Sequence, residues 1–340
     1  MKKTAVMTTL IMLIAGLAMF VQTATAETIE LRFASPFSPR QTMIAKVFPR
    51  WAENVTKATN GKLKVSMFPG GALGKTPAHY SIAEKGVADI AYSLHDYTPG
   101  RFPMTSVFEL PFMVPSAEKT SMALWKVFDQ FPEFQKEYSK VKVLALFVHP
   151  GGHFNTTKKP IRSLADFKGM KFRTANPHVT KALKSFGAIP VNMPITETYM
   201  SIERGVVEGT VLPWEGNFVF KLAELLKYGT EVDFYTMTMF VVMNKKKWNS
   251  LPADVKKAID ANSGMVFSQD AGKTYDGARP FMKKMCLKKG MESITLPASE
   301  MAKLKALTAP LREDWVKEME AKGFKSAKDV LAAAVKYVNE

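Results

Sequence analysis

The sequence predicts an α/β protein with two domains. Strand-like and helix-like patterns alternate along the chain up to about residue 140, and the alternation then starts again. The chain has 340 residues, which is more than one hydrophobic core usually organises. From Pro252 onward the pattern is almost wholly helical, and a kink or break is expected at Pro280.

The first α/β layer is predicted from five segments. Residues 29–33 alternate apolar and polar side chains, as a strand with one buried face does. Residues 63–68 and 87–92 are further expected strands, and the spacing of apolar residues predicts helices over 41–59 and 76–85. This strand–helix order is typical of a sheet with parallel strands.

The second layer repeats the order. Strands are expected at 141–148, 170–173, 188–191 and 207–212, helices at 177–186 and 196–204, and a late strand at 240–244 that returns to the first domain. Two domains joined by more than one crossing form a cleft. Ligands of open α/β sheets bind beyond the carboxyl ends of the strands, so the residues just after each strand are the first candidates for a site.

The first 26 residues have the pattern of a cleaved secretory signal peptide. Lys2 and Lys3 precede an apolar run over 10–21, and residues 24–26 (Ala-Thr-Ala) form a small-x-small cleavage site. The apolar run is too short to cross roughly 30 Å of hydrocarbon, so we expect no membrane anchor. No cysteine lies directly after this run, which argues against a lipid anchor.

Charge and cysteine content narrow the function classes. With 47 Lys+Arg and 31 Asp+Glu the net charge is +16. The lysines are scattered and form no arginine-rich tract, so we interpret the charge as solvated surface rather than as a nucleic-acid interface. The only cysteine, Cys286, excludes an internal disulfide and is expected as a half-buried thiol on an amphipathic helix. A reactive nucleophile is the alternative.

No catalytic motif is present. The sequence contains neither a Gly-x-Ser-x-Gly elbow, nor a His-Glu-x-x-His zinc helix, nor a phosphate loop. Residues 68–76 resemble a nucleotide loop only in part and predict a tight turn. His149 and His153 have i, i+4 spacing, but Pro150-Gly151-Gly152 between them is incompatible with one helical turn, so no metal site is expected.

Arg173 is the strongest single candidate for ligand binding. It ends the expected strand 170–173, and a guanidinium there can offer two parallel N–H donors to a carboxylate. Taken alone, a structural role for this arginine is an equal alternative.

The chain resembles a known family, the extracytoplasmic solute-binding proteins that serve tripartite ATP-independent periplasmic (TRAP) transporters. Within that family it resembles the dicarboxylate-binding-protein (DctP) type. The resemblance covers essentially the whole chain after the signal peptide. It is carried by the segments 71–74, 109–112, 163–173, 187–191, 197–199, 205–209 and 248–252, together with Pro194 and Asn244, in this order and spacing.

The resemblance implies a periplasmic-binding-protein-like α/β fold with a ligand cleft between two domains and a long bridging helix. We expect one domain from 27–150 with about 239–278, and the other from 151–238 with about 279–340. The arginine of the family's Gly-x-Lys-x-Arg strand, which binds the ligand carboxylate, is Arg173 here. The family implies a periplasmic binding protein rather than an enzyme, which hands a small carboxylate to a membrane permease. From the sequence we expect no cofactor and no metal-ligating residues, while assistance of ligand binding by a metal ion stays open.

Two departures from the family pattern bear on the ligand. A second arginine of sialic-acid-binding members is replaced by His153, and an asparagine before a proline is replaced by Leu212, with Trp214 close behind. An unpaired carboxylate or hydroxyl beside leucine is costly to bury. We therefore expect an aromatic or apolar 2-oxo or 2-hydroxy monocarboxylate. If Leu212 faces the core instead, Asn217 is the candidate polar anchor.

Aromatic residues that follow strands complete the candidate site. Phe37, Tyr92 and Tyr97 join Trp214 as side chains that can line an aromatic slot, and His153 can bond a keto or hydroxyl oxygen. Two alternatives stay open. One is a C4-dicarboxylate or sugar-acid ligand within the same family. The other, from another class, is a secreted α/β hydrolase, although this sequence contains no nucleophile–base motif.

Overall fold

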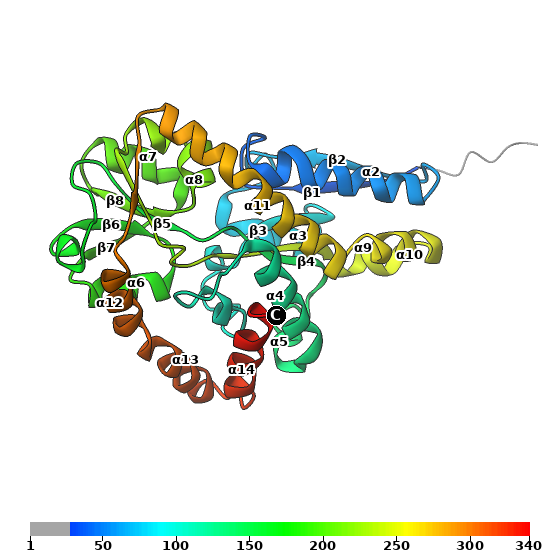
Figure 1. Cartoon of the computed structure of the whole chain (residues 1–340). Coiled ribbons are helices and arrows are strands. Elements are labelled where there is room, and N and C mark those ends of the chain that lie inside the picture. The colour runs from blue at the N-terminus through cyan, green and yellow to red at the C-terminus, as the bar shows by residue number, and fades with distance from the viewer. Residues whose placement is uncertain (1–27) are drawn as a thin grey trace, which may run out of the picture.

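Two β-sheets with helices on their faces make up the structure (Figure 1). The computed structural model describes residues 28–340, so the predicted signal peptide lies outside the described residues. Within 28–340, no helix combines the length and apolar character that crossing a bilayer requires.

The first sheet has the order β2-β1-β3-β10-β4. Its strands are β2 (Leu63–Phe68), β1 (Ile29–Ala34), β3 (Ile90–Leu94), β10 (Thr238–Asn244) and β4 (Val141–Val148). The first three run parallel, as the strand–helix order predicts, whereas β10 is antiparallel to both of its neighbours. Strands β3 and β10 are buried along their whole length, which explains their continuous apolar sequences.

The second sheet has the order β11-β9-β5-β8-β6-β7. Its strands are β11 (Glu292–Thr295), β9 (Tyr228–Glu231), β5 (His153–Thr156), β8 (Gly209–Leu212), β6 (Lys171–Thr174) and β7 (Ile189–Asn192). Strand β5 is antiparallel to β8 and β9, and the other pairs are parallel. Each sheet is therefore mixed, not purely parallel as the sequence pattern suggested, because each contains one strand that enters from the other half of the molecule.

The helices cover both sheets. They are α2 (Phe48–Ala58), α3 (His79–Lys85), α4 (Ala117–Gln130), α5 (Pro132–Lys136), α6 (Pro177–Ser185), α7 (Thr198–Glu203), α8 (Trp214–Val219), α9 (Lys245–Ser250), α10 (Ala253–Ala261), α11 (Met265–Lys288), α12 (Ala298–Thr308), α13 (Pro310–Ala321) and α14 (Ala327–Val338). A wider turn at Met43–Val47 leads into α2, and tight single turns lie at Thr76–Ala78, His95–Tyr97, Thr105–Glu109, Leu164–Phe167, Ile195–Glu197 and Leu222–Glu224.

Helix α11 bridges the two halves. It packs against α4 beside the first sheet and against α8 beside the second, and Figure 1 shows it crossing the molecule diagonally. Of the kink or break expected at Pro280, the break is wrong, because the helix is continuous from Met265 to Lys288. Pro280 lies on the exposed side, while Tyr275 and Met282 are buried on either side of it and hold the helix in place.

Two chain segments cross between the sheets side by side. One follows β4 and the other precedes β10, and they are joined where Gly152 N donates to Tyr235 O and Phe234 N donates to Gly152 O, both at 2.8 Å. A Cβ on Gly152 would lie 2.5 Å from the Tyr235 ring. The glycine is therefore required for this close approach, and the pair of segments forms the candidate hinge.

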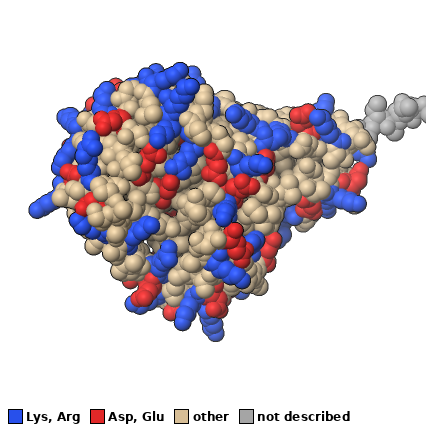
Figure 2. All heavy atoms as spheres, viewed as in Figure 1, with Lys and Arg blue, Asp and Glu red and all other residues tan. Residues whose placement is uncertain are grey.

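The C-terminal helices return to the first half. In Figure 1, α12, α13 and α14 run in an arc from the second sheet, and α14 ends against α4. Strand β11 interrupts the region after Pro252 that the sequence pattern predicted as almost wholly helical. Lys and Arg side chains are spread over the face in Figure 2 and mixed with acidic ones, without one dominant basic patch.

Candidate functional site

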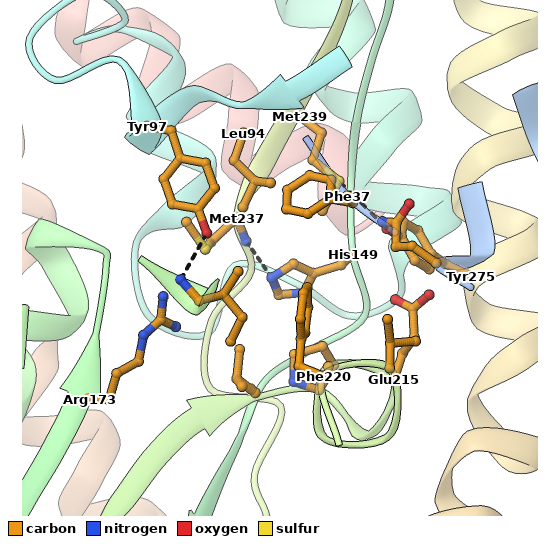
Figure 3. A pocket seen from close by; sticks show the side chains of 16 residues that line it. Phe37, Leu94, Tyr97, His149, Arg173, Glu215, Phe220, Met237, Met239 and Tyr275 are labelled. Atoms are coloured by element: carbon orange, nitrogen blue, oxygen red, sulfur yellow. Dashed lines mark hydrogen bonds between the residues drawn. The ribbon is translucent and has the colours of Figure 1, made fainter. Parts of the chain in front are cut away.

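A small cavity of about 60 Å³ lies where the carboxyl ends of strands from both sheets meet (Figure 3). It is lined by Phe37, Gln41, Leu94, Tyr97, His149, Arg173, Ile195, Leu212, Pro213, Glu215, Gly216, Val219, Phe220, Met237, Met239 and Tyr275. The wall combines residues that follow β1, β3, β4 and β8 with the ends of α8 and the middle of α11. The cavity therefore depends on both halves of the molecule and on the bridging helix.

Arg173 supplies the positive charge of the cavity. It lies in β6, in register with Thr210 of β8 and Val191 of β7, and only 1% of its surface is exposed. Its Nε donates to the carbonyl of Met193 at 3.0 Å, which fixes the guanidinium plane. Its Nη2 is buried without a hydrogen-bond partner among residues 28–340.

No carboxylate of residues 28–340 lies within 4.0 Å of the Arg173 guanidinium, although its charge lowers the pKa of the buried Asp96 in part. Burying a charge without a partner is strongly unfavourable. The guanidinium also influences its neighbour Tyr97, whose pKa is raised by burial and lowered in part by Arg173. An anionic group of a ligand, placed beside Nη2, would supply the hydrogen-bond acceptor that this nitrogen lacks among residues 28–340.

Aromatic and aliphatic side chains form most of the remaining wall. Phe37 packs at 5.5 Å from Tyr92, 6.4 Å from Tyr97 and 6.3 Å from Phe220, as measured between ring centroids. Leu212 borders the same cavity and is 6% exposed. These contacts give a flat apolar ligand body surfaces to pack against.

His149 is a neutral part of the wall. Its Nδ1 donates to the carbonyl of Pro150 at 2.6 Å, and its Nε2 accepts from the backbone N–H of Met237 at 3.1 Å. Burial lowers the pKa of His149 to about 4. Both ring nitrogens are thus engaged by the two crossing segments, so His149 offers its ring face rather than a proton.

Four of the predicted site residues line the cavity: Phe37, Tyr97, Arg173 and Leu212. Tyr92 does not line it but packs directly behind Phe37.

The other three predicted residues lie next to the cavity, behind its wall. The rings of His153 and Trp214 pack against each other with centroids 5.6 Å apart, and burial lowers the pKa of His153 to about 3. Asn217 donates to Asn155 Oδ1 at 2.8 Å. The lining of the cavity includes none of the three. The Nε2 of His153 is buried without a hydrogen-bond partner among residues 28–340, so its contact with a ligand stays a prediction.

Several lining residues were missed by the sequence analysis. His149 directly follows β4, and Glu215 follows β8 by three positions, so the strand-end rule could have found both. Tyr275 comes from the middle of α11, and no local pattern marks it. Gln41 and the two methionines, Met237 and Met239, likewise carry no motif.

Cys286 is fully buried in α11, not half-buried as expected, and its thiol lies 3.3 Å from the carbonyl of Trp214. Burial raises the pKa of this thiol to about 12, which disfavours the reactive thiolate. Across residues 28–340, no group of three or more His, Cys, Asp or Glu side chains could hold a metal ion.

Comparison with known proteins identifies the family. The family described as bacterial extracellular solute-binding protein, family 7 (DctP), matches residues 33–319. The chain belongs to this family. The TRAP solute-binding fold and the resemblance drawn from the sequence are thereby confirmed. Members of this family act as solute receptors.

Three solved TRAP solute-binding proteins illustrate the similarity. One from Rhodoferax ferrireducens, in complex with copurified benzoate, is 34% identical, with a TM-score of 0.88 over 92% of this chain and 98% of that chain. One from a marine metagenome, specific for aromatic acid ligands and in complex with metahydroxyphenylacetate, is 35% identical, with a TM-score of 0.87 over 92% and 98%. One from Bordetella bronchiseptica, with bound (R)- and (S)-mandelate, is 26% identical, with a TM-score of 0.85 over 92% and 99%.

Proposed function

We propose that this protein captures an aromatic monocarboxylate between its two halves and delivers it to the permease of a TRAP transporter. The observation that carries the proposal is the buried Arg173 guanidinium, whose Nη2 has no partner among the described residues. A carboxylate beside it would gain charge-assisted hydrogen bonds in a desolvated setting. The remaining apolar wall would receive the body of the acid.

The ligand class follows from the wall and is supported by the relatives. Benzoate, metahydroxyphenylacetate and mandelate, each found in a similar solved protein, are aromatic monocarboxylates, and mandelate is also a 2-hydroxy acid. Here Tyr97 lies at the Arg173 end of the cavity in Figure 3, where a 2-oxygen next to the carboxylate would arrive. An aromatic 2-oxo or 2-hydroxy acid would therefore use both groups.

A C4-dicarboxylate suits this cavity less well. Its second carboxylate would need another cation, but Arg173 is the only Lys or Arg that lines the cavity in residues 28–340. The other polar groups of the wall include the carboxyl of Glu215, which would repel it. A sugar acid would bury many hydroxyls against Leu212 and Phe37 without donors to meet them.

Delivery requires release, so we propose that the two sheets are the cores of two domains that open and close about the paired crossing segments. A ligand shifts this equilibrium only by binding the closed form more tightly. The family and the predicted signal peptide support action in the periplasm, with the membrane subunits of the transporter as partners.

The test is calorimetric binding of benzoate, mandelate and phenylpyruvate to the chain without residues 1–26. Arg173→Lys keeps the charge but loses the paired donors, and Arg173→Ala loses both. Removing one partner of a desolvated charge pair commonly costs about 2–5 kcal/mol, or roughly 30-fold or more in Kd. Arg204→Lys, an exposed matched control, should bind as the unchanged protein does. If both Arg173 variants bound these acids with the same Kd as the unchanged protein, the proposal would be refuted.

A further inference from the structure

The cavity has a second polar end. Figure 3 shows Glu215 and Tyr275 on the side opposite Arg173, with Phe37, His149 and Phe220 between them. Gln41 belongs to this end, because its Nε2 donates to the hydroxyl oxygen of Tyr275 at 2.7 Å. The carboxylate role of Arg173 leaves this cluster without an assigned function.

The amide nitrogen of Gln41 faces two tyrosine hydroxyls. Its Nε2 also donates to the hydroxyl oxygen of Tyr92 at 2.9 Å, so both amide hydrogens are used. The hydroxyls of Tyr92 and Tyr275 in turn point to Met239 Sδ at 3.2 and 3.7 Å. Gln41 Oε1 is left as a buried acceptor with no partner among residues 28–340, on a side chain only 6% exposed.

Glu215 adds a second acceptor beside it. The first residues of α8 place its carboxyl at the cavity, and its Oε1 accepts from the backbone N–H of Thr42 at 2.9 Å, next to Gln41 in the chain. Burial raises the pKa of Glu215, and the hydrogen bonds from Thr42 lower it in part. Gln41 and Glu215 both line the cavity, and the amide nitrogen of Gln41 is already bonded to Tyr92 and Tyr275.

We propose that Gln41 Oε1, assisted by Glu215, receives a hydrogen-bond donor on the far end of the ligand, so that the preferred ligands are aromatic monocarboxylates with a ring hydroxyl. The inference rests on the proposed function, since the carboxylate must lie at Arg173 for the ring hydroxyl to reach Gln41. A buried acceptor without a partner is unfavourable, and a phenolic O–H supplies the missing bond. Gln41 is thus a specificity-determining residue.

The experiment compares three probes that differ at one ring position: phenylacetate, 3-hydroxyphenylacetate and 3-methylphenylacetate, with the 4-substituted pair as a second series. Hydroxyl and methyl groups are similar in size, but only the hydroxyl donates. In calorimetry with the unchanged protein, we expect a hydroxylated isomer to bind about 3- to 10-fold more tightly than its methyl counterpart.

Gln41→Met removes the amide and keeps the side-chain length. The ratio of the two Kd values, for the methyl and the hydroxyl isomer, should fall to about one in this variant. Its circular dichroism spectrum shows separately that the variant is folded. Should Gln41→Met not fold, Tyr275→Phe removes one of the two hydroxyls that orient the amide, and the hydroxyl preference should shrink.

Two results would overturn the inference: no hydroxyl preference in the unchanged protein, or a preference of equal size in Gln41→Met. These differ from failure of the proposed function, in which none of the probes binds or in which Arg173→Ala leaves their binding unchanged.

Discussion

Leu212 is the strand residue that we propose selects the class of ligand. It ends β8, lines the cavity and stands in register with His153 of β5. An aliphatic side chain at this point can only pack against a ligand, whereas a polar one would need a partner. We therefore expect Leu212 to disfavour ligands whose polar groups would be buried beside it without a hydrogen bond.

Leu212→Asn should reverse that selectivity. An aromatic acid would bury the new amide without hydrogen bonds, so we expect its Kd to rise about tenfold, equivalent to about 1.4 kcal/mol. Malate and other polar acids should gain in relative affinity. A thermal-shift panel measures both, with Leu212→Met as the apolar control of similar volume. Unchanged ranking of the acids in Leu212→Asn would contradict this role.

His149 should make stability depend on pH. Its pKa of about 4 in the folded chain lies below the ordinary value of 6.5, so the unfolded chain binds the extra proton between these limits. Stability from this group is complete above pH 6.5 and is lost as pH falls toward 4, by about 2 kcal/mol at pH 5. His149→Gln, which keeps an acceptor for Met237 N–H, should flatten urea-unfolding stability between pH 7 and 5.

His178 is the matched control for that measurement. It is also buried, and burial lowers its pKa to about 4, but it lies outside the cavity. His178→Gln should flatten the pH dependence as His149→Gln does, yet only His149→Gln should alter the affinity for benzoate. Parallel pH curves for the unchanged protein and both variants would contradict the linkage.

The rule that ligands bind beyond strand ends explains how much of the site the sequence could predict. It found Arg173, Phe37 and Tyr97 because each belongs to a strand or the turn after it, whereas Leu212 was selected as a departure from the family pattern. It could not separate wall from core, so it also selected Trp214, whose ring packs on His153.

At the scale of elements, prediction succeeded where the pattern is local. Strands β1 and β4 and helix α6 begin and end close to their predicted bounds, because alternation, continuous burial and an N-terminal proline mark them. The short strands β5 and β9 were not predicted. Each has four residues and depends on pairing with the other, so the local sequence carries little signal.

The crossing of α11 over α4 requires a glycine. A Cβ on Gly272 would lie 2.6 Å from the carbonyl oxygen of Ala117 and 2.6 Å from Glu118 Cα. Gly272→Ala should therefore destabilise the protein by about 1–3 kcal/mol through overpacking, measured as a lower midpoint in urea.

Gly277 of the same helix is the control, because a Cβ on this residue would have no other atom within 4 Å. Gly277→Ala should leave packing unchanged and stabilise the helix by up to about 1 kcal/mol. If Gly272→Ala were as stable as Gly277→Ala, α11 and α4 would not be in such close contact in solution.

At the scale of the whole molecule, the Asn176 amide is one of the contacts between the two halves. Asn176 precedes α6, and its Nδ2 donates to Asp96 Oδ2 at 2.9 Å and to Glu109 Oε2 at 2.8 Å, both beside the first sheet. Burial raises the pKa of Asp96 to about 6 and that of Glu109 as well. The contact exists only while the halves are together.

Asn176→Asp should therefore favour the open form. Aspartate keeps the acceptor that receives Val179 N–H at the start of α6, but it places a third carboxyl beside Asp96 and Glu109. We expect weaker benzoate binding at pH 8 than at pH 6. X-ray scattering with saturating benzoate should show a larger radius of gyration than for the unchanged protein.

Asn54→Asp, on the exposed side of α2, is the control and should not change either measurement. For the unchanged protein, benzoate should reduce the radius of gyration. Identical scattering curves with and without ligand would contradict domain closure.

The place of β10 between β3 and β4 has a consequence for how the chain is made. The first sheet needs this strand between β3 and β4, yet β10 begins at Thr238, after most of the second sheet has been synthesised. A growing chain that ends before residue 238 therefore holds β1 to β4 without the strand that joins β3 to β4. Neither half can be produced as a contiguous fragment, so the first sheet can be completed only after the chain has passed through the second half.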